Sequence, residues 1–225
     1  MRTSFAMRVT RLPCGRATRC RGLCGQGPSL VDELACNTLR GLGRRGLPCF
    51  AVPPAAVSFI GSPNELHEEL RRGAERAVRR VHVASLYVGM GEHSGALLQA
   101  LAAGAGRGRE IHLLVDYHRA LRRGSDGKAP VDQLAGVVAL GRSARVSLYR
   151  HPGGPPAALE AVLPREAFEA CGVQHAKLCI FDDDVLLTGA NLSDDYLTTR
   201  QDRGVVLSAV SEPETNLPFL PLPPS

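Results

Sequence analysis

The residues best suited to chemistry are His175 and Lys177, which are followed, after four further residues, by Asp182. In an extended strand, side chains two residues apart project from the same face, so both can act on one bound phosphate. An imidazole can form a covalent bond to phosphorus, and an ammonium group stabilises charge on the non-bridging oxygens. The spacing therefore predicts phosphodiester chemistry with His175 and Lys177 as catalytic residues, and this chemistry needs neither a metal nor another cofactor.

Composition supports this interpretation of the motif. The chain has 7 His, and Lys128 and Lys177 are the only lysines among its 27 basic residues. Chance alone would produce such a motif roughly 0.003 times in a chain of this composition. Because arginine is used almost everywhere else, a lysine at position 177 indicates that a compact point charge is needed there. The competing interpretation is an ordinary strand histidine beside a surface charge.

Asp182 completes the motif and is assigned to the catalytic set on that ground. Parity places its side chain on the other face of the strand from His175, unless a turn at Asp183 and Asp184 redirects it. We therefore expect Asp182 to brace a hairpin or a neighbouring basic group rather than to contact His175.

From about residue 50, strand-like and helix-like segments alternate, and these must position the motif. The strand-like runs are 56–60, 81–88, 111–116 and 145–149. Helices are expected from a cap at Ser62 or Asn64 to about Val78, around 97–101, and over 130–141. The segment 172–193 indicates two further strands joined by a turn. This alternation predicts an α/β fold with a mixed or mostly parallel sheet, and the apolar run 111–116 predicts that both faces are covered.

The two ends of the chain differ from this central part. Residues 1–50 contain nine Arg and two acidic residues, the composition of a mitochondrial targeting segment, with a disordered basic tail or a nucleic-acid arm as alternatives. We place this segment at 1–49, the catalytic part at 50–207, and a disordered, proline-rich tail at 208–225. No stretch approaches the roughly 20 apolar residues that span a bilayer, so any membrane contact is expected to be peripheral.

The motif, together with Gly189 and Asn191 after it, resembles that of the phospholipase D superfamily. The run from Gln174 to Arg203 resembles, more narrowly, the mitochondrial phosphatidylglycerophosphate synthase family, and the likeness extends from about Phe50 to Leu207. The resemblance implies a phospholipase D-like half-domain, with a mixed central sheet flanked by helices. It also implies transfer of the phosphatidyl group from CDP-diacylglycerol to glycerol 3-phosphate at the mitochondrial inner membrane, a step towards phosphatidylglycerol and cardiolipin.

The same resemblance implies roles for individual residues. His175 would carry the phosphatidyl group, Lys177 would neutralise its oxygens, Asn191 would support the phosphate site, and Arg203 would bind the phosphate of the acceptor. Contact with a nucleotide, the CDP moiety or ATP, would involve the run Ala84, Ser85, Leu86, Tyr87, Val88, Gly89, Met90 and Gly91. An ordinary strand-to-helix turn is an equal alternative for this run, and a surface ion pair for Arg203.

The chain departs from the family pattern in one respect. Family members have two similar halves that each donate one His-Lys pair, whereas His175 is the only histidine here that is followed two residues later by lysine. Two outcomes remain open: a homodimer that assembles one site, or a truncated chain that is inactive and acts as a binding module. A lost half would leave an apolar face exposed and favour association.

A third hypothesis is a homodimeric phosphodiesterase or nuclease that uses water as acceptor. A nucleic-acid groove needs a basic stripe, and the part after residue 50 is slightly acidic. Nucleic acid is therefore not expected as a partner.

Overall fold

The structure, a computed structural model, describes residues 52–139, 143–154, 158–159, 162–163 and 165–209, with six isolated positions between 34 and 45. The chain divides into two units, Met1–Pro53 and Pro54–Ser225, and the sheet lies in the second. Apart from those six positions, the predicted targeting segment 1–49 lies outside the described residues. So does the predicted tail from residue 210 onward, and the predicted domain boundaries stay a prediction.

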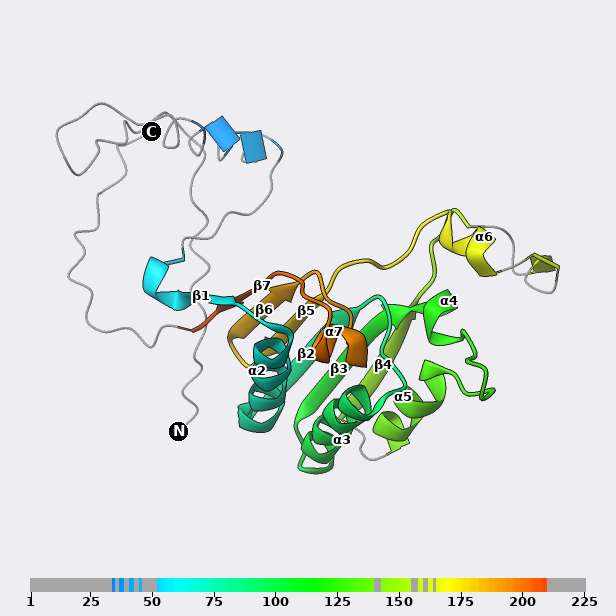
Figure 1. Cartoon of the computed structure of the whole chain (residues 1–225), viewed down its shortest axis with the longest axis horizontal. Coiled ribbons are helices and arrows are strands. Elements are labelled where there is room, and N and C mark those ends of the chain that lie inside the picture. Colours follow the sequence, from blue (N-terminus) through cyan, green and yellow to red (C-terminus); the bar gives the residue numbers. More distant parts are fainter. Residues whose placement is uncertain are drawn as a thin grey trace. The chain divides into compact units, whose positions relative to one another are not determined.

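A seven-stranded mixed sheet forms the centre of the second unit, with strand order β1-β7-β6-β5-β2-β3-β4 (Figure 1). The strands are β1 (Val57–Ile60), β2 (Arg80–Ser85), β3 (Glu110–Asp116), β4 (Ala144–Tyr149), β5 (Leu178–Phe181), β6 (Asp184–Thr188) and β7 (Gly204–Leu207). β2, β3 and β4 run parallel, and every other neighbouring pair is antiparallel. The predicted α/β class with a mixed sheet is confirmed.

Helix α2 begins where the sequence supplies a cap. Ser62 accepts a hydrogen bond from Glu65 N at 3.2 Å, and Pro63 occupies the first helical position, so α2 (Pro63–Arg76) starts as predicted. The other helices of the second unit, within the described residues, are α3 (Glu92–Gly106), α4 (Tyr117–Ala120), α5 (Pro130–Ala139), α6 (Arg165–Glu169) and α7 (Asp194–Thr198), with a 3-10 turn, η1, at Pro54–Ala56. Within the described residues, no helix is both long and apolar enough to cross a membrane.

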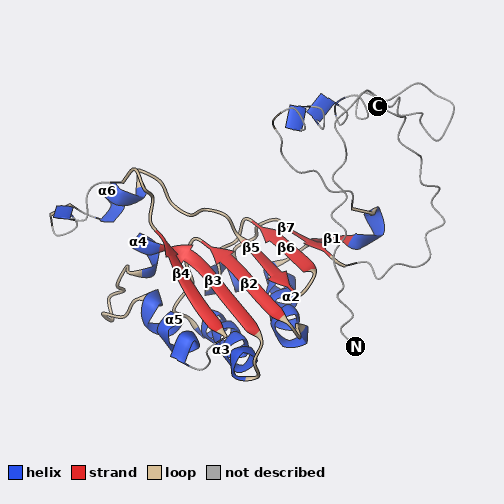
Figure 2. Ribbon diagram, turned by 180° about the vertical axis from the view of Figure 1, so that it is seen from behind, coloured by secondary structure: helices blue, strands red, loops and turns tan. Residues whose placement is uncertain are grey.

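One face of the sheet carries the core. Helices α2, α3, α5 and α7 lie on this face. Figure 1 shows the sheet from the side of these helices, and Figure 2 shows it from the opposite side. The strands alternate accordingly: Val81 and Val83 of β2 and Ile111 and Leu113 of β3 are buried beneath the helices. Burial of these side chains supplies the main driving force for folding.

The run 111–116 had predicted that helices cover both faces of the sheet, and for the described part of the chain this prediction was wrong. No described helix crosses the second face in Figure 2, and we call it the open face. The run looks continuously apolar because Leu114 lies on the open face beside His112, and both are only half-buried. Period-two alternation therefore holds in β3, hidden by one leucine.

The predicted hairpin is present, but its boundaries differ. β5 begins at Leu178, so His175 and Lys177 precede the strand rather than belong to it. The turn falls at Asp182 and Asp183, and Asp182 adopts a left-handed conformation with φ of 55°, which aspartate tolerates better than most residues. Likewise, the strand predicted over 81–88 ends at Ser85, because the chain then turns towards α3.

The strand directions bring several chain segments to one edge of the sheet. β1, β2, β3, β4 and β6 end there, whereas β5 and β7 begin there. We call it the carboxyl edge. In open sheets with parallel strands, ligands bind beyond the carboxyl ends of the strands, where the connections leave in different directions.

Candidate active site

His175 and Lys177 meet at the carboxyl edge, immediately before β5. Lys177 Nζ lies 3.2 Å from His175 Nε2 and donates a hydrogen bond to His175 O at 3.0 Å. A charged ammonium group can only donate, so Nε2 accepts in this contact and the imidazole proton is assigned to Nδ1. The lone pair that would attack a substrate is therefore the one on Nε2, which here accepts from Lys177.

The two side chains differ sharply in exposure. Lys177 is 9% exposed, whereas His175 is open to solvent. Burial lowers the pKa of the Lys177 ammonium, and the nearby carboxylate of Asp202 partly opposes this by favouring the charged form. A buried cation with its donors aimed at one imidazole is well arranged to hold an anion beside that imidazole.

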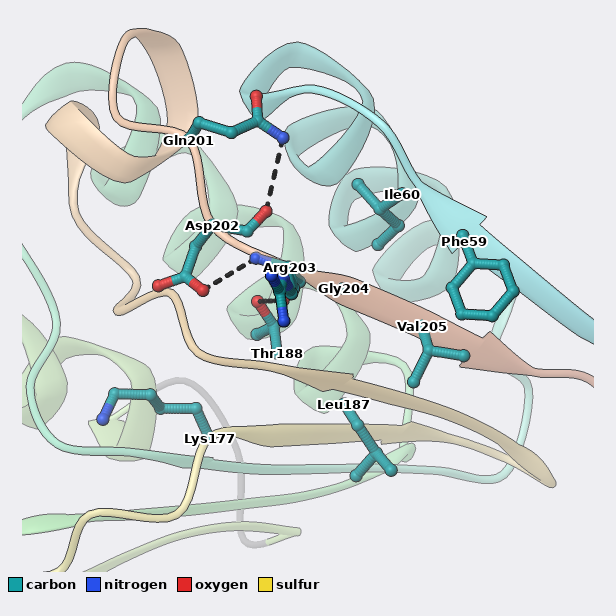
Figure 3. A pocket seen from close by; sticks show the side chains of 10 residues that line it. All are labelled: Phe59, Ile60, Lys177, Leu187, Thr188, Gln201, Asp202, Arg203, Gly204 and Val205. Carbon is teal, nitrogen blue, oxygen red and sulfur yellow. Dashed lines mark hydrogen bonds between the residues drawn. The ribbon is translucent and has the colours of Figure 1, made fainter. Parts of the chain in front are cut away.

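Lys177 also lines a cleft of about 960 Å³ (Figure 3). The polar part of the lining comes from Lys177, Thr188, Gln201, Asp202 and Arg203, and the apolar part from Phe59, Ile60, Leu187, Gly204 and Val205. Phe59 is 80% exposed and Leu187 is 39% exposed, although both are large apolar side chains. The cleft therefore joins a cationic end to an apolar wall on the open face.

Arg203 lies at the start of β7, beside the end of β6. Its carbonyl oxygen accepts hydrogen bonds from Thr188 Oγ1 at 2.9 Å and Gly189 N at 3.2 Å, while its own N–H donates to Asp202 Oδ1 at 2.7 Å. The structure thus brings predicted Arg203 into the same cleft as Lys177. Asp202 and Thr188 join them there.

Asp182 lies at the other end of β5, about 16 Å from Lys177 along an extended chain. Its carboxylate accepts hydrogen bonds from the backbone N–H groups of Val78, Arg79 and Arg80, at 2.7, 2.8 and 2.9 Å. Burial acts to raise the pKa of Asp182, but these three hydrogen bonds outweigh it and lower the pKa below the usual 3.8. The structure does not bring Asp182 to the His175 end of the strand.

Asn191 follows β6 in a segment that packs against the chain beyond β2. Leu192 forms a parallel bridge with Val88, and Gly89 N donates to Leu192 O at 2.7 Å. Asn191 is buried, and its Oδ1 has no hydrogen-bond partner among the described residues. Buried amides normally satisfy both groups, so an orphaned oxygen here is consistent with a ligand partner.

The run Ala84–Gly91 is thereby placed next to Asn191, although the helix end that follows it is already occupied. Asp194 accepts hydrogen bonds from His93 N and Ser94 N, both at 3.0 Å, and from Ser94 Oγ at 2.7 Å. Burial acts to raise the pKa of Asp194, but the bonds from Ser94 and His93 prevail and lower it to about 2. A carboxylate therefore fills the position that a phosphate takes at other helix N-termini.

Sequence reasoning missed three residues of this region. Asp194 caps α3 from 100 residues away in the chain. Gln174, the residue before His175, is buried, and its N–H donates to the buried carboxylate of Asp116. Gly91 offered the only sequence signal for the cap, since it marks a turn before a helix. No group of His, Cys, Asp and Glu that could hold a metal occurs among the described residues.

Comparison with curated proteins identifies the family. The chain is 38% identical over 167 residues to the probable CDP-diacylglycerol–glycerol-3-phosphate 3-phosphatidyltransferase of Dictyostelium discoideum, and 34% identical over 207 residues to the mitochondrial protein of that name from Gallus gallus. These matches cover 73% and 88% of this chain. The chain belongs to this family of phosphatidyltransferases. It spans about a third of the relatives' length, 29% and 34% of the two proteins.

Solved structures agree with this assignment at the level of the fold. The crystal structure of phosphatidylserine synthase from Haemophilus influenzae is similar with a TM-score of 0.55 and 23% identity, over 70% of this chain and 34% of that one. The predicted phospholipase D-like fold is confirmed. No protein-family model matches the chain. In this chain, the pair His175 and Lys177 lies at the carboxyl edge of a seven-stranded sheet.

Proposed function

We propose that this chain supplies one half of a phosphatidyltransferase site, in which His175 takes the phosphatidyl group of CDP-diacylglycerol and passes it to glycerol 3-phosphate. The observation that carries the proposal is the 3.2 Å contact between Lys177 Nζ and His175 Nε2 at the carboxyl edge. The names of the relatives supply the two substrates. The buried ammonium and the exposed imidazole supply the chemistry.

The proposed reaction has two displacements at phosphorus. His175 Nε2 attacks the phosphatidyl phosphorus; a P–N bond forms, the P–O bond to CMP breaks, and CMP leaves with the electron pair and takes a proton from a general acid. A hydroxyl of glycerol 3-phosphate then attacks phosphorus, the P–N bond breaks, and the hydroxyl proton returns to that same acid–base group. Lys177 stabilises the charge on the non-bridging oxygens in both steps.

The remaining predicted residues have places in this scheme. Asn191, with its orphaned buried oxygen, would orient the phosphate region, and Arg203 in the cleft would bind the phosphate of glycerol 3-phosphate. The run Ala84–Gly91 would contact the CDP moiety through its exposed parts, since its helix end is filled by Asp194. Asp182 would act structurally, through the chain before β2.

One His-Lys pair leaves the acid–base group unassigned, and we propose that a second copy of the chain supplies it. The cleft beside Lys177 has an apolar wall in which Phe59 and Leu187 are exposed, as an interface would require. Two copies related by a two-fold axis through this cleft would bring two His-Lys pairs together. The mitochondrion, at the inner membrane surface, is proposed as the location because relatives are named mitochondrial.

The test is CMP release and labelled lipid product from the purified full chain, given CDP-diacylglycerol and labelled glycerol 3-phosphate in detergent. We expect product from the wild type and from His67→Ala, a control histidine on α2, and at least a 1,000-fold loss in His175→Ala, as for other nucleophile deletions, which reach about 10⁶-fold. Product from His175→Ala would contradict the assigned nucleophile. No product from a folded wild type would instead favour a binding module.

A further inference from the structure

His175 sits in a segment with no regular secondary structure of its own. Residues 172–177 form neither helix nor strand, and β5 begins only at Leu178. Among the described residues, its backbone–backbone hydrogen bonds lie at its two ends, where Gly172 N donates to Glu169 O and Thr188 N donates to Lys177 O. Between these ends, the backbone is held in place by side chains or is mobile. How precisely the His175 imidazole is positioned therefore depends on a few individual contacts.

Gln174 provides two of these contacts, one on each side of His175. Its backbone N–H donates to Asp116 Oδ2 at 3.1 Å, and its side-chain Nε2 donates to Ala176 O at 3.0 Å. The side chain thus passes His175 and ties the following residue. Gln174 is only 9% exposed, so these bonds are shielded from competing water.

Asp116 anchors this arrangement to the sheet. It is the last residue of β3, it is 1% exposed, and its Oδ1 accepts hydrogen bonds from His118 N and Arg119 N at the start of α4. Its other oxygen, Oδ2, receives Gln174 N. A buried carboxylate with both oxygens engaged is costly to displace, which makes it a rigid reference point.

We propose that Asp116 and Gln174 are positioning residues that hold His175 in its attacking geometry, acting as a single unit. This inference rests on the proposed function, since it assumes that His175 is the nucleophile. Neither residue needs to touch the reacting phosphate. Lys177, whose ammonium group donates to His175 O, completes the fixation of this short segment.

The kinetic signature of such a unit is a fall in kcat with little change in KM. A displacement of the nucleophile by about 1 Å costs on the order of 100-fold in rate, whereas substrate binding depends on other contacts. We expect kcat to fall about 10- to 100-fold in Gln174→Met, which keeps the volume and removes the donor to Ala176 O. KM should stay within about twofold.

Asp116→Asn gives a second, independent test. Its remaining oxygen can still accept from His118 N and Arg119 N, but the new amide group would present a donor to Gln174 N–H. If both residues act through one unit, the double variant should lose little more than the stronger single variant, rather than the product of the two losses.

Matched controls come from α5, away from this segment. Gln133, like Gln174, has a buried side-chain oxygen without a partner among the described residues, and Asp132 accepts a hydrogen bond from Ala129 N at 2.9 Å. Gln133→Met and Asp132→Asn should leave kcat and KM unchanged. Gln133→Met shows how the loss of a buried amide elsewhere affects kcat and KM, and Asp132→Asn shows the same for a carboxylate that accepts a backbone N–H.

The experiment combines steady-state kinetics of all variants with hydrogen–deuterium exchange over residues 172–177, using the full chain. A kcat-specific loss in Gln174→Met and Asp116→Asn, absent from both controls, supports the inference. If the wild type is active and both variants keep its kcat, the inference is overturned and the proposed function stands. If the wild type is inactive, the proposed function fails, and hydrogen–deuterium exchange tests the inference instead. Exchange about tenfold faster in both variants than in the wild type, and only over 172–177, supports the fixation. Equal exchange rates overturn it.

Discussion

The two ends of the motif lie at the two ends of one strand, β5, and they differ in charge and in hydrogen-bond partners. Before the strand, the Lys177 ammonium lies 3.2 Å from the exposed His175 imidazole, beside a cleft. After the strand, the Asp182 carboxylate accepts three backbone N–H groups in a tight turn. One end has a solvent-exposed imidazole beside an accessible cleft, whereas the other has a carboxylate whose acceptor capacity is used by the fold.

The difference shows that residues joined by a sequence motif need not share a site. Asp182 bonds to the chain that leads into β2, the strand beside β5, and so fixes how β5 meets its neighbour. That alignment places Lys177 at the carboxyl edge. A residue can thus be required by a motif because it sets the position of the strand that presents the chemistry.

Of the variants that test this difference between the two ends of β5, the largest expected effect on activity comes from replacing Lys177. Lys177→Met should lower kcat about 100- to 1,000-fold, because the buried charge that faces the phosphate is lost. Stability should not fall, since burial penalises the ammonium in the folded state. Transfer assays and thermal melts measure both. Lys128→Met, the only other lysine, is the control, and an equal loss in that variant would break the comparison.

At the other end, Asp182→Asn should act on stability instead. Asparagine tolerates the φ of 55° but supplies one acceptor oxygen where the carboxylate supplies two, so the three N–H donors cannot all be satisfied. We expect a loss of about 1–3 kcal/mol in the free energy of unfolding, with kcat per folded molecule within about threefold of wild type. Urea unfolding measures the first. A kcat lost in fully folded Asp182→Asn would assign this end to the chemistry.

The smallest effect concerns pH and compares Asp182 with Asp194, the carboxylate that caps α3. Both have pKa values lowered in the folded state, Asp194 to about 2, so each stabilises the fold above the unfolded value of 3.8. This contribution is lost as pH falls from about 4 to about 2. Asp194→Asn should remove about 1 kcal/mol at neutral pH and flatten the acid limb of the stability curve. Asp126→Asn in the exposed 124–128 loop should leave that limb unchanged.

The sequence was informative wherever local periodicity decided the outcome. Alternation identified six of the seven strands, Ser62 identified the start of α2, and the two-residue separation of His175 and Lys177 identified a pair that the structure brings together. Asp182 also lies away from His175, as expected, although the reason is the length of β5 between them and not strand parity. These features depend on neighbours within a few residues.

Contacts between distant segments were not accessible in the same way. Asp194 caps a helix that begins 102 positions earlier, at Glu92, and Asp116 meets Gln174 across 58 positions. No local pattern distinguishes such a carboxylate from a solvated one, because its partner is set by the order of strands in the sheet. The strand β7 was missed for a similar reason: it has four residues, Gly204–Leu207, and its pairing with β1 and β6 comes from tertiary structure.

The most direct test of the account is to trap the covalent intermediate. The full-length wild type, Asp182→Asn and His175→Ala would each be incubated with phosphate-labelled CDP-diacylglycerol without acceptor, quenched at alkaline pH and mapped by mass spectrometry. We expect an acid-labile phosphatidyl adduct on His175 in the wild type and in folded Asp182→Asn, and none in His175→Ala. An adduct on another residue, or its absence from folded Asp182→Asn alone, would contradict the separation of chemistry and structure along β5.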